Sequence, residues 1–242
     1  MSSLTKTGDD KIQVRGSLDM FLSVHETMFI LTEQVRNVPK AYRLTGTTEE
    51  GIVGLSKAGI SALKYDKDPG RVEELMTQKS RELRMLKLPA GQKEEFTVTA
   101  MQEVVEYYGV KEAMSVLFGE EIILIPQIPD EILDMVTPQT LLAGLADVPG
   151  ELLKILRYRL TTSLFTPRQK YVMWNKLHAI TQQIYETLEK FVDVPGRILH
   201  AGHRYDYRYN FRFGALPRVQ NIVERCEEQV LRWQEYLEKK EE

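Results

Sequence analysis

Residues 137–164 read TPQTLLAGLADVPGELLKILRYRLTTSL, and this stretch predicts a long amphipathic helix. Thr137 followed by Pro138 is a typical helix start, because threonine caps the first turn and proline lacks only an amide hydrogen that would have no partner there. Apolar residues then recur at three- and four-residue steps, which is the period of one helix face. Thr166 followed by Pro167 repeats the start signal directly afterwards. We therefore expect two consecutive helices in this part of the chain.

The same helical period continues over most of the remaining sequence. Only residues 204–213 alternate convincingly over a strand-like length, while residues 122–125, Ile-Ile-Leu-Ile, fit either a short strand or an extended apolar linker. Helices with short connections predict an all-α fold, a helical bundle. The helices that we expect span about residues 17–35, 48–65, 71–87, 94–118, 137–164, 166–191 and 216–240.

Composition indicates an ordinary globular protein rather than a fibrous, disulfide-rich or membrane one. The chain has 242 residues, of which 43% are hydrophobic and 28% charged, with a formal net charge of −3. We expect residues 1–14 to form a flexible N-terminal tail and residues 15–242 to form a single helical domain. The single cysteine, Cys226, excludes an intrachain disulfide and a cysteine-based zinc site. A reducing compartment, and hence a cytoplasmic location, fits best, since neither a signal-peptide core nor a membrane span is expected.

Two pairs of acidic residues form the strongest candidate site. Glu103 and Glu106 have i, i+3 spacing, and Asp147 and Glu151 have i, i+4 spacing, so each pair shares one helix face. Both pairs lie in apolar surroundings, where ionised carboxylates are costly unless they are paired or bind metal. If the two helices are neighbours, the four carboxylates suit Mg²⁺ or Mn²⁺, and such a site can stabilise both the attacking and the leaving oxygen of a phosphodiester. Acidic pairs are also common on solvated helix faces, and that alternative stays open.

Two motifs around these acids resemble the translin/Trax family. Residues 102–106, Gln-Glu-Val-Val-Glu, are similar to the Gln-Glu-x-x-Glu helix of Trax, the catalytic partner of translin. Residues 142–152 resemble the Trax segment Leu-x-Gly-x-Ala-Asp-x-x-Gly-Glu-Leu, and residues 216–221 resemble the start of the last helix of the family. The resemblance covers about residues 21–237, although the N-terminal third matches poorly.

The resemblance implies a seven-helix bundle, and members of this family assemble into hollow barrel-like oligomers, commonly octamers. Trax subunits are Mg²⁺-dependent endoribonucleases that act on single-stranded RNA, which implies the same activity here, with Mn²⁺ as a possible substitute. By motif position, Glu103, Glu106 and Asp147 would be the catalytic metal ligands, and Glu151 would complete the metal site. Translin lacks the full acidic set, so these acids favour the Trax-like branch. The chain would form a homo-oligomer or a hetero-oligomer with a translin-like subunit.

One residue departs from the family pattern inside the second acidic motif. Pro149 removes the hydrogen bond to the carbonyl of Leu145, and we expect it to kink the helix. Such a kink could reorient Asp147 against Glu151.

Basic residues suited to RNA contacts lie in two places. Lys154 and Arg157 follow the acids with i, i+3 spacing, whereas Arg159 points elsewhere, and a solvated helix end is the alternative reading. Residues 204–213 interleave three cationic with five aromatic residues, a pattern typical of single-strand binding, or alternatively of a packed loop or a subunit contact. The RNA-binding candidates are Lys154, Arg157, Arg204, Arg208 and Arg212.

Two functions from other classes remain open at this point. A non-catalytic, translin-like scaffold would bind single-stranded nucleic acid in a salt-sensitive way without turnover. A helical structural protein would instead pair its acids with lysines and would bind neither metal nor RNA.

Overall fold

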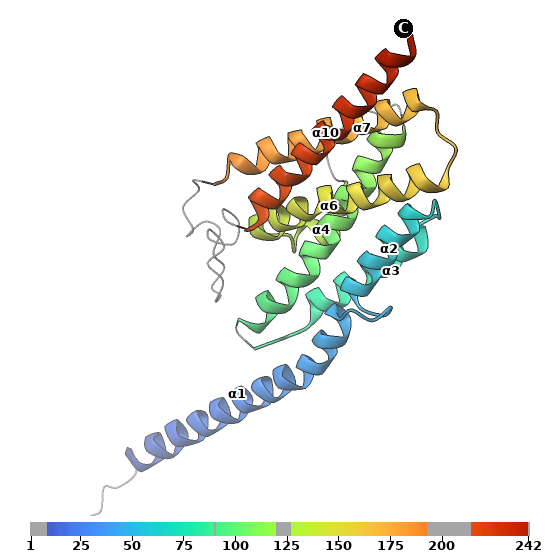
Figure 1. Ribbon diagram of the computed structural model, residues 1–242. Coiled ribbons are helices and arrows are strands. Elements are labelled where there is room, and N and C mark those ends of the chain that lie inside the picture. The colour runs from blue at the N-terminus through green and yellow to red at the C-terminus, as the bar shows by residue number, and fades with distance from the viewer. Residues whose placement is uncertain (1–8, 90, 120–126, 193–213, 242) are drawn as a thin grey trace, which may run out of the picture.

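The computed structural model describes residues 9–89, 91–119, 127–192 and 214–241, and all the regular structure in these residues is helical (Figure 1). Its helices are α1 Asp9–Thr45, α2 Ile52–Lys64, α3 Gly70–Met85, α4 Gln92–Phe118, α5 Asp130–Leu133, α6 Pro138–Thr162, α7 Pro167–Glu189 and α10 Leu216–Glu241. The seven predicted helices are therefore confirmed, and α5 adds a single turn. Residues 122–125 and 204–213 lie outside the described residues.

The predicted starts of α6 and α7 are confirmed in atomic detail. The Thr140 amide donates to Thr137 Oγ1 at 3.2 Å, and the Thr137 amide donates to Thr140 Oγ1 at 2.8 Å. Thr166 forms the same reciprocal pair with Gln169, and proline opens both helices. These capping boxes satisfy amide groups that the first helical turn leaves without partners, so the Thr-Pro signal has a direct physical cause.

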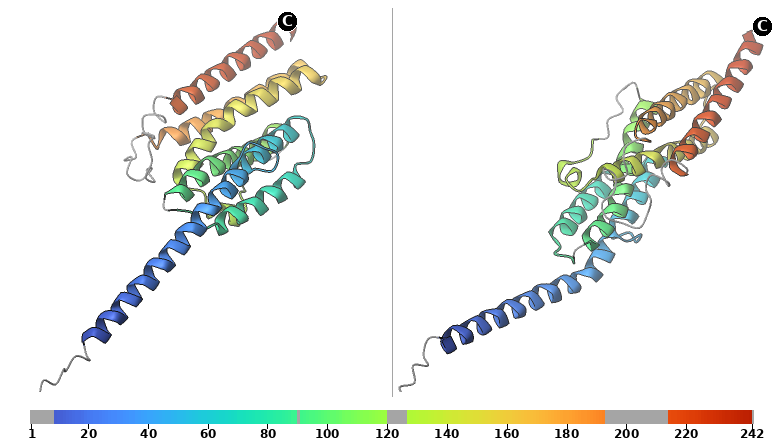
Figure 2. Two further views of the ribbon diagram at one scale, coloured as in Figure 1. Left: turned by 90° about the horizontal axis from the view of Figure 1, so that it is seen from below. Right: turned by 90° about the vertical axis from the view of Figure 1, so that its left-hand side faces the viewer.

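Helix α1 extends beyond the prediction at both ends. It is already helical at Asp9, within the segment expected as a tail, and it continues through Pro39 to Thr45. Beyond Pro39, Ala41 is fully buried and Leu44 is 4% exposed. Their burial in the bundle favours continuation of the helix and opposes the effect of proline. The preceding part of α1 projects from the bundle as a long arm (Figures 1 and 2).

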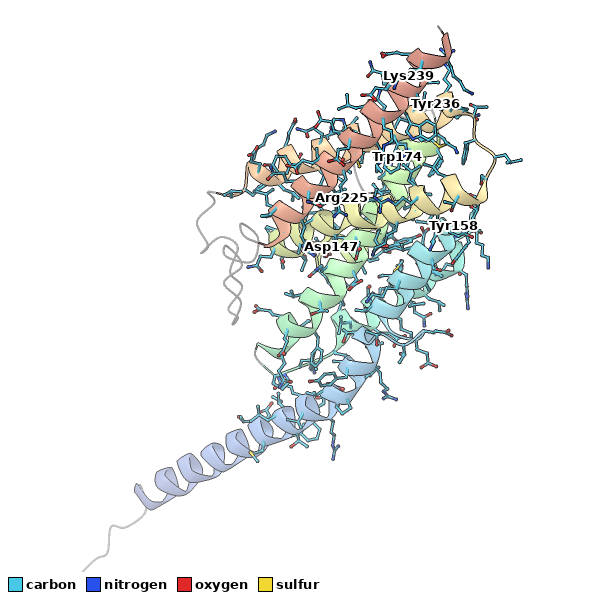
Figure 3. All side chains as sticks on the ribbon, viewed as in Figure 1. Asp147, Tyr158, Trp174, Arg225, Tyr236 and Lys239 are labelled. Carbon is cyan, nitrogen blue, oxygen red and sulfur yellow. The ribbon has the colours of Figure 1, made fainter. Side chains whose placement is uncertain are left out.

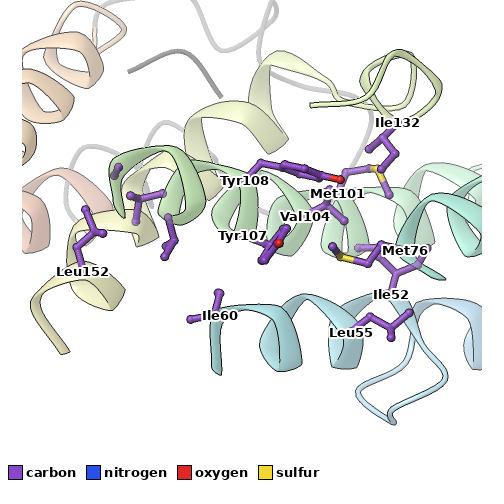
Figure 4. Close-up of a cluster of buried hydrophobic side chains, with 14 of the residues drawn as sticks. Ile52, Leu55, Ile60, Met76, Met101, Val104, Tyr107, Tyr108, Ile132 and Leu152 are labelled. Atoms are coloured by element: carbon purple, nitrogen blue, oxygen red, sulfur yellow. The ribbon is translucent and has the colours of Figure 1, made fainter. Parts of the chain in front are cut away.

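Helix α4 is the central element of the bundle. It packs against α2 and α6, while α7 and α10 lie side by side beyond α6 (Figures 1 and 2). Buried side chains from α2, α3, α5 and α6 surround it, as Figure 4 shows for Ile52, Met76, Ile132 and Leu152. A helix that is buried on most of its circumference carries apolar residues all round. Any acidic residue in the middle of α4 is therefore close to the core.

A glycine sets the distance between α4 and α6. A Cβ on Gly144 would lie 2.6 Å from the Gln102 carbonyl oxygen and 2.7 Å from Val105 Cβ. Only the missing side chain permits this approach, because a backbone carbonyl cannot rotate aside. This close crossing brings together the two helices that carry the acidic pairs.

We expect Gly144→Ala to destabilise the protein by about 1–3 kcal/mol, because the added methyl group forces α6 away from α4. The matched control is Gly150→Ala on the same helix, where an added Cβ would meet only Ile222 Cδ1 at 4.0 Å. There, the better helix propensity of alanine should stabilise by up to about 1 kcal/mol. Urea unfolding measures both changes, and equal effects of the two substitutions would contradict the close-approach role of Gly144.

No helix in the described ranges has an apolar stretch long and uncharged enough to cross a lipid bilayer.

Candidate functional site

The crossing of α4 and α6 brings the four predicted acids together. The charges of Glu103, Asp147 and Glu151 all raise the pKa of Glu106, and the charge of Asp147 also raises the pKa of Glu103. Such mutual effects require the carboxylates to be near one another. Both acidic pairs therefore lie on neighbouring helices and close to one another.

Glu106 lies at the centre of this acidic cluster, which we define as Glu103, Glu106, Asp147 and Glu151. Its residue is 9% exposed. Burial raises the pKa of Glu106 to about 8, and the three neighbouring carboxylates add to that shift, while Lys154 opposes it. Near neutral pH, Glu106 therefore holds a proton in the absence of a bound cation. A raised carboxyl pKa in a pocket is a frequent property of functional sites.

Glu103 is only partly satisfied by its surroundings. Its pKa is raised mainly by burial and by Asp147, although Lys57 and a hydrogen bond shared with Glu106 act in the opposite direction. Lys57 Nζ lies 3.7 Å from Glu103 Oε1. In the described part of the chain, Glu103 Oε2 is buried and has no hydrogen-bond partner. A buried oxygen of this kind requires a shared proton, a water molecule or a cation.

The two acids of α6 are turned toward cations and an amide. Gln102 Nε2 donates to Asp147 Oδ2 at 3.0 Å, and Arg218 Nη2 of α10 lies 3.5 Å from Asp147 Oδ1. Lys154 Nζ lies 2.5 Å from Glu151 Oε1. Each acid of α6 thus has an oppositely charged partner, whereas Glu106 forms no ion pair with any described residue.

The donor set fits a divalent cation, although the side chains are not arranged around one. Among the described residues, no three Asp, Glu, His or Cys side chains are placed to hold one ion as they stand. Four carboxylates and the unsatisfied Glu103 Oε2 nevertheless provide the hard oxygen donors that Mg²⁺ and Mn²⁺ prefer. To bind there, a cation would have to replace the lysine or arginine that pairs with Glu103, Asp147 or Glu151.

A pocket of about 280 Å³ between α2 and α6 opens onto Glu103, Glu106 and Glu151, whereas Asp147 does not line it. Three lysines surround it and two isoleucines contribute apolar surface, so it offers both charge and shape to a ligand. The lining residues are Lys57, Ile60, Ser61, Lys64, Tyr65, Glu103, Glu106, Glu151, Lys154 and Ile155. Of these, the α2 residues were missed by the sequence reading, because no local pattern links them to the acids.

The predicted RNA-binding residues separate into different places. Lys154 lines the pocket, and its pKa is raised by its hydrogen bond to Glu151. Arg157 is exposed and does not line that pocket. Its charge instead lowers the pKa of the Cys226 thiol on α10, against the larger effect of burial. Arg159 points elsewhere, as expected, and its guanidinium donates to Leu63 O at 2.8 Å and to Asp66. The remaining candidates, Arg204, Arg208 and Arg212, lie outside the described residues.

Pro149 lies inside α6 and does not end the helix, and the kink expected from the sequence stays a prediction. The helix runs from Pro138 to Thr162 with Pro149 inside it, and the Pro149 side chain is buried. Asp147 and Glu151 lie on either side of Pro149 in the sequence, and the charges of both raise the pKa of Glu106. Pro149 therefore does not separate the two acids.

Comparison with known proteins shows a solved structure with a similar fold. The sequence matches no known family model, and no curated protein is a significant match. A solved structure of AfC3PO in complex with duplex RNA has a TM-score of 0.52 at 17% identity, covering 93% of this chain and 96% of that chain. A crystal structure of AfC3PO has a TM-score of 0.49 at 18% identity, with the same coverage. The first likeness shows that this chain has the helical fold of AfC3PO over nearly its whole length.

Proposed function

We propose that this protein is a Trax-like, Mg²⁺-dependent endoribonuclease that acts on single-stranded RNA. The observation that carries the proposal is the convergence of Glu103, Glu106, Asp147 and Glu151 where α4 crosses α6. Two further observations support it. The acidic motifs resemble those of Trax, and AfC3PO, whose fold the chain shares, has been solved as a complex with duplex RNA.

The electrostatics favour a ligand site over a purely structural role for the acids. Three ion pairs, Lys57–Glu103, Lys154–Glu151 and Arg218–Asp147, fit a structural protein equally well. Glu106 does not fit that reading, because burial raises its pKa to about 8 and no cation forms an ion pair with it among the described residues. A structural site gains nothing from a buried acid of this kind, whereas a cation site uses its negative charge.

The residues around the pocket define what each group would do. Glu103, Glu106, Asp147 and Glu151 would hold one or two Mg²⁺ ions, which would supply charge to stabilise the attacking and leaving oxygens at phosphorus. Glu106 would release its proton when the cation binds. Lys57 and Lys154, freed from their carboxylate partners, would then be available to contact phosphate oxygens. The cluster is partly shielded from water, which strengthens each of these interactions.

The decisive experiment compares cleavage and binding on labelled RNA. We expect purified protein to cut a single-stranded oligoribonucleotide with Mg²⁺ or Mn²⁺ present, and to leave it intact in EDTA. The same sequence as a duplex tests whether strand form matters, since the AfC3PO complex contains duplex RNA. Salt-sensitive binding without cleavage in either metal would support the translin-like scaffold and refute the nuclease. If the protein neither binds nor cleaves RNA, the remaining hypothesis is a structural protein.

We also propose that the chain acts as an oligomer, either alone or with a translin-like subunit. Helix α1 leaves large apolar side chains exposed, including Phe29 at 66%, Val35 at 62% and Met28 at 59%. A contiguous exposed apolar surface is typical of a protein interface. Mass measurement of the intact complex, purified with whatever co-isolates, distinguishes the homo-oligomer from the hetero-oligomer, and a stable monomer would contradict both.

A further inference from the structure

Aromatic and cationic side chains gather where α2 ends beside α6. The rings of Tyr65 and Tyr158 lie 5.1 Å apart, edge to face, at an interplanar angle of 84°. Lys64 Nζ lies 4.7 Å from the Tyr158 ring centroid and 5.4 Å from that of Tyr65. Figure 3 shows Tyr158 on α6 near the end of α2. We call Lys64, Tyr65 and Tyr158 the aromatic pair with its lysine.

This group is continuous with the acidic pocket. Lys64 and Tyr65 line the same pocket as Glu103, Glu106 and Glu151. On α6, Glu151 and Tyr158 are seven residues apart and share one face, which places the tyrosine about 10 Å along the helix from the acid. Lys154 lies between them on that face and also lines the pocket. One surface therefore runs from carboxylates through lysines to the exposed Tyr65 ring and the half-buried Tyr158 ring.

The exposure of Tyr65 indicates that the rings are not simply core. Tyr65 is 48% exposed and follows the last helical residue of α2. The edge-to-face contact leaves part of the exposed Tyr65 ring accessible, with Lys64 Nζ over that ring at 5.4 Å. An open aromatic face beside cations is the arrangement on which nucleobases stack, and such stacking tolerates any base sequence.

We propose that Tyr65 and Tyr158, with Lys64, form a stacking site for a nucleobase that adjoins the nucleotide held at the acidic cluster. This inference rests on the proposed function, and it names how the strand is positioned. The lysines contact the backbone phosphates, and the aromatic faces hold a neighbouring base. The site binds unpaired bases, because a base inside a duplex has both faces covered.

A purely structural role for the rings makes a different prediction. In that case Lys64, Tyr65 and Tyr158 would serve only to pack the end of α2 against α6. Their loss would then lower the free energy of unfolding without affecting RNA binding. The chain provides a matched control on α10. Tyr236 is 41% exposed, its ring lies 5.6 Å from Trp233 edge to face, and Lys240 Nζ lies 5.1 Å from its centroid. The Tyr236 group resembles the pair chemically, but it lines none of the pocket at the acids.

The test measures binding by fluorescence anisotropy with a labelled ten-nucleotide oligoadenylate, with Ca²⁺ in place of Mg²⁺ so that the carboxylates are occupied, and a gel confirms that the probe stays intact. An abasic strand of equal length serves as the second probe. Tyr65→Ala should weaken oligoadenylate binding about 5- to 100-fold, as expected for loss of one stacked base. Tyr65→Phe should bind like the unmodified protein, since the ring face remains. Abasic-strand binding should not change in either variant, and Tyr236→Ala should change neither probe.

The outcomes separate this inference from the function on which it rests. If unmodified protein binds no RNA, both fail. If it binds oligoadenylate and Tyr65→Ala binds equally well, only the stacking site is overturned. Equal loss of affinity for the abasic strand and for oligoadenylate would also overturn it, because base contact would then play no part. Thermal melts of each variant confirm that it is folded before binding is compared.

Discussion

Glu103→Gln is expected to reduce Mg²⁺-dependent RNA cleavage by about 100-fold or more while the protein stays folded. Within the part of the chain that the structure describes, Glu103 Oε2 is buried without a hydrogen-bond partner, so Glu103 is the acid most available to a cation. Removing one charged ligand withdraws several kcal/mol of transition-state stabilisation, and each tenfold loss in rate corresponds to about 1.4 kcal/mol. Glutamine keeps the side-chain volume, and its amide can donate to Glu106, so the fold should not suffer.

The measurement is initial cleavage rate against Mg²⁺ concentration, with Asp147→Asn as a second variant. The matched control is Glu95→Gln, which removes an exposed acid from the first turn of the same helix. We expect full activity in the control and a comparable loss in the two site variants. Undiminished cleavage by both Glu103→Gln and Asp147→Asn would refute the assignment of the site.

Local signals explain why most of the fold could be predicted. Helix starts such as Thr137-Pro138 depend on atoms within four residues, and the capping bonds there are present as expected. The end of α1 could not be predicted in the same way. Pro39 is a local stop signal, but burial of Ala41 and Leu44 against distant helices overrides it. Tertiary packing decides the outcome wherever it opposes a local preference.

The candidate site was predictable only in part for the same reason. Spacing shows that Glu103 shares a face with Glu106, but not which helix that face meets. The resemblance to Trax supplied the partner helix, and the crossing at Gly144 confirms that the acids of α6 meet those of α4. The cations Lys57 and Arg218 were missed, because each lies dozens of residues from its acid in the chain. Contacts of that range leave no periodic pattern in a sequence.

Glu106→Gln is expected to stabilise the cation-free protein at alkaline pH and to change little under acidic conditions. The pKa of Glu106 is about 8 in the folded protein, against 4.5 for an unperturbed glutamate. Between these pH values the folded chain keeps a proton that the unfolded chain releases. The stability from the neutral carboxyl is therefore complete below about pH 4.5 and is lost as pH rises through 8.

Glutamine imitates the neutral carboxyl at every pH, so the two proteins should diverge as pH rises. By pH 9 the variant should be more stable by roughly 3 kcal/mol, less than the pKa change alone would give, because water reaches the pocket. Urea unfolding at pH 5 and pH 9 measures this, with Glu95→Gln as the control that shows no divergence. Adding Mg²⁺ at pH 9 should stabilise the unmodified protein and leave Glu106→Gln almost unchanged, because the cation then neutralises the charge that the variant lacks. The prediction fails if the free energies of unfolding of the unmodified protein and of Glu106→Gln change equally between pH 5 and pH 9 and on addition of Mg²⁺. Glu106 would then neither titrate in this range nor contribute to cation binding.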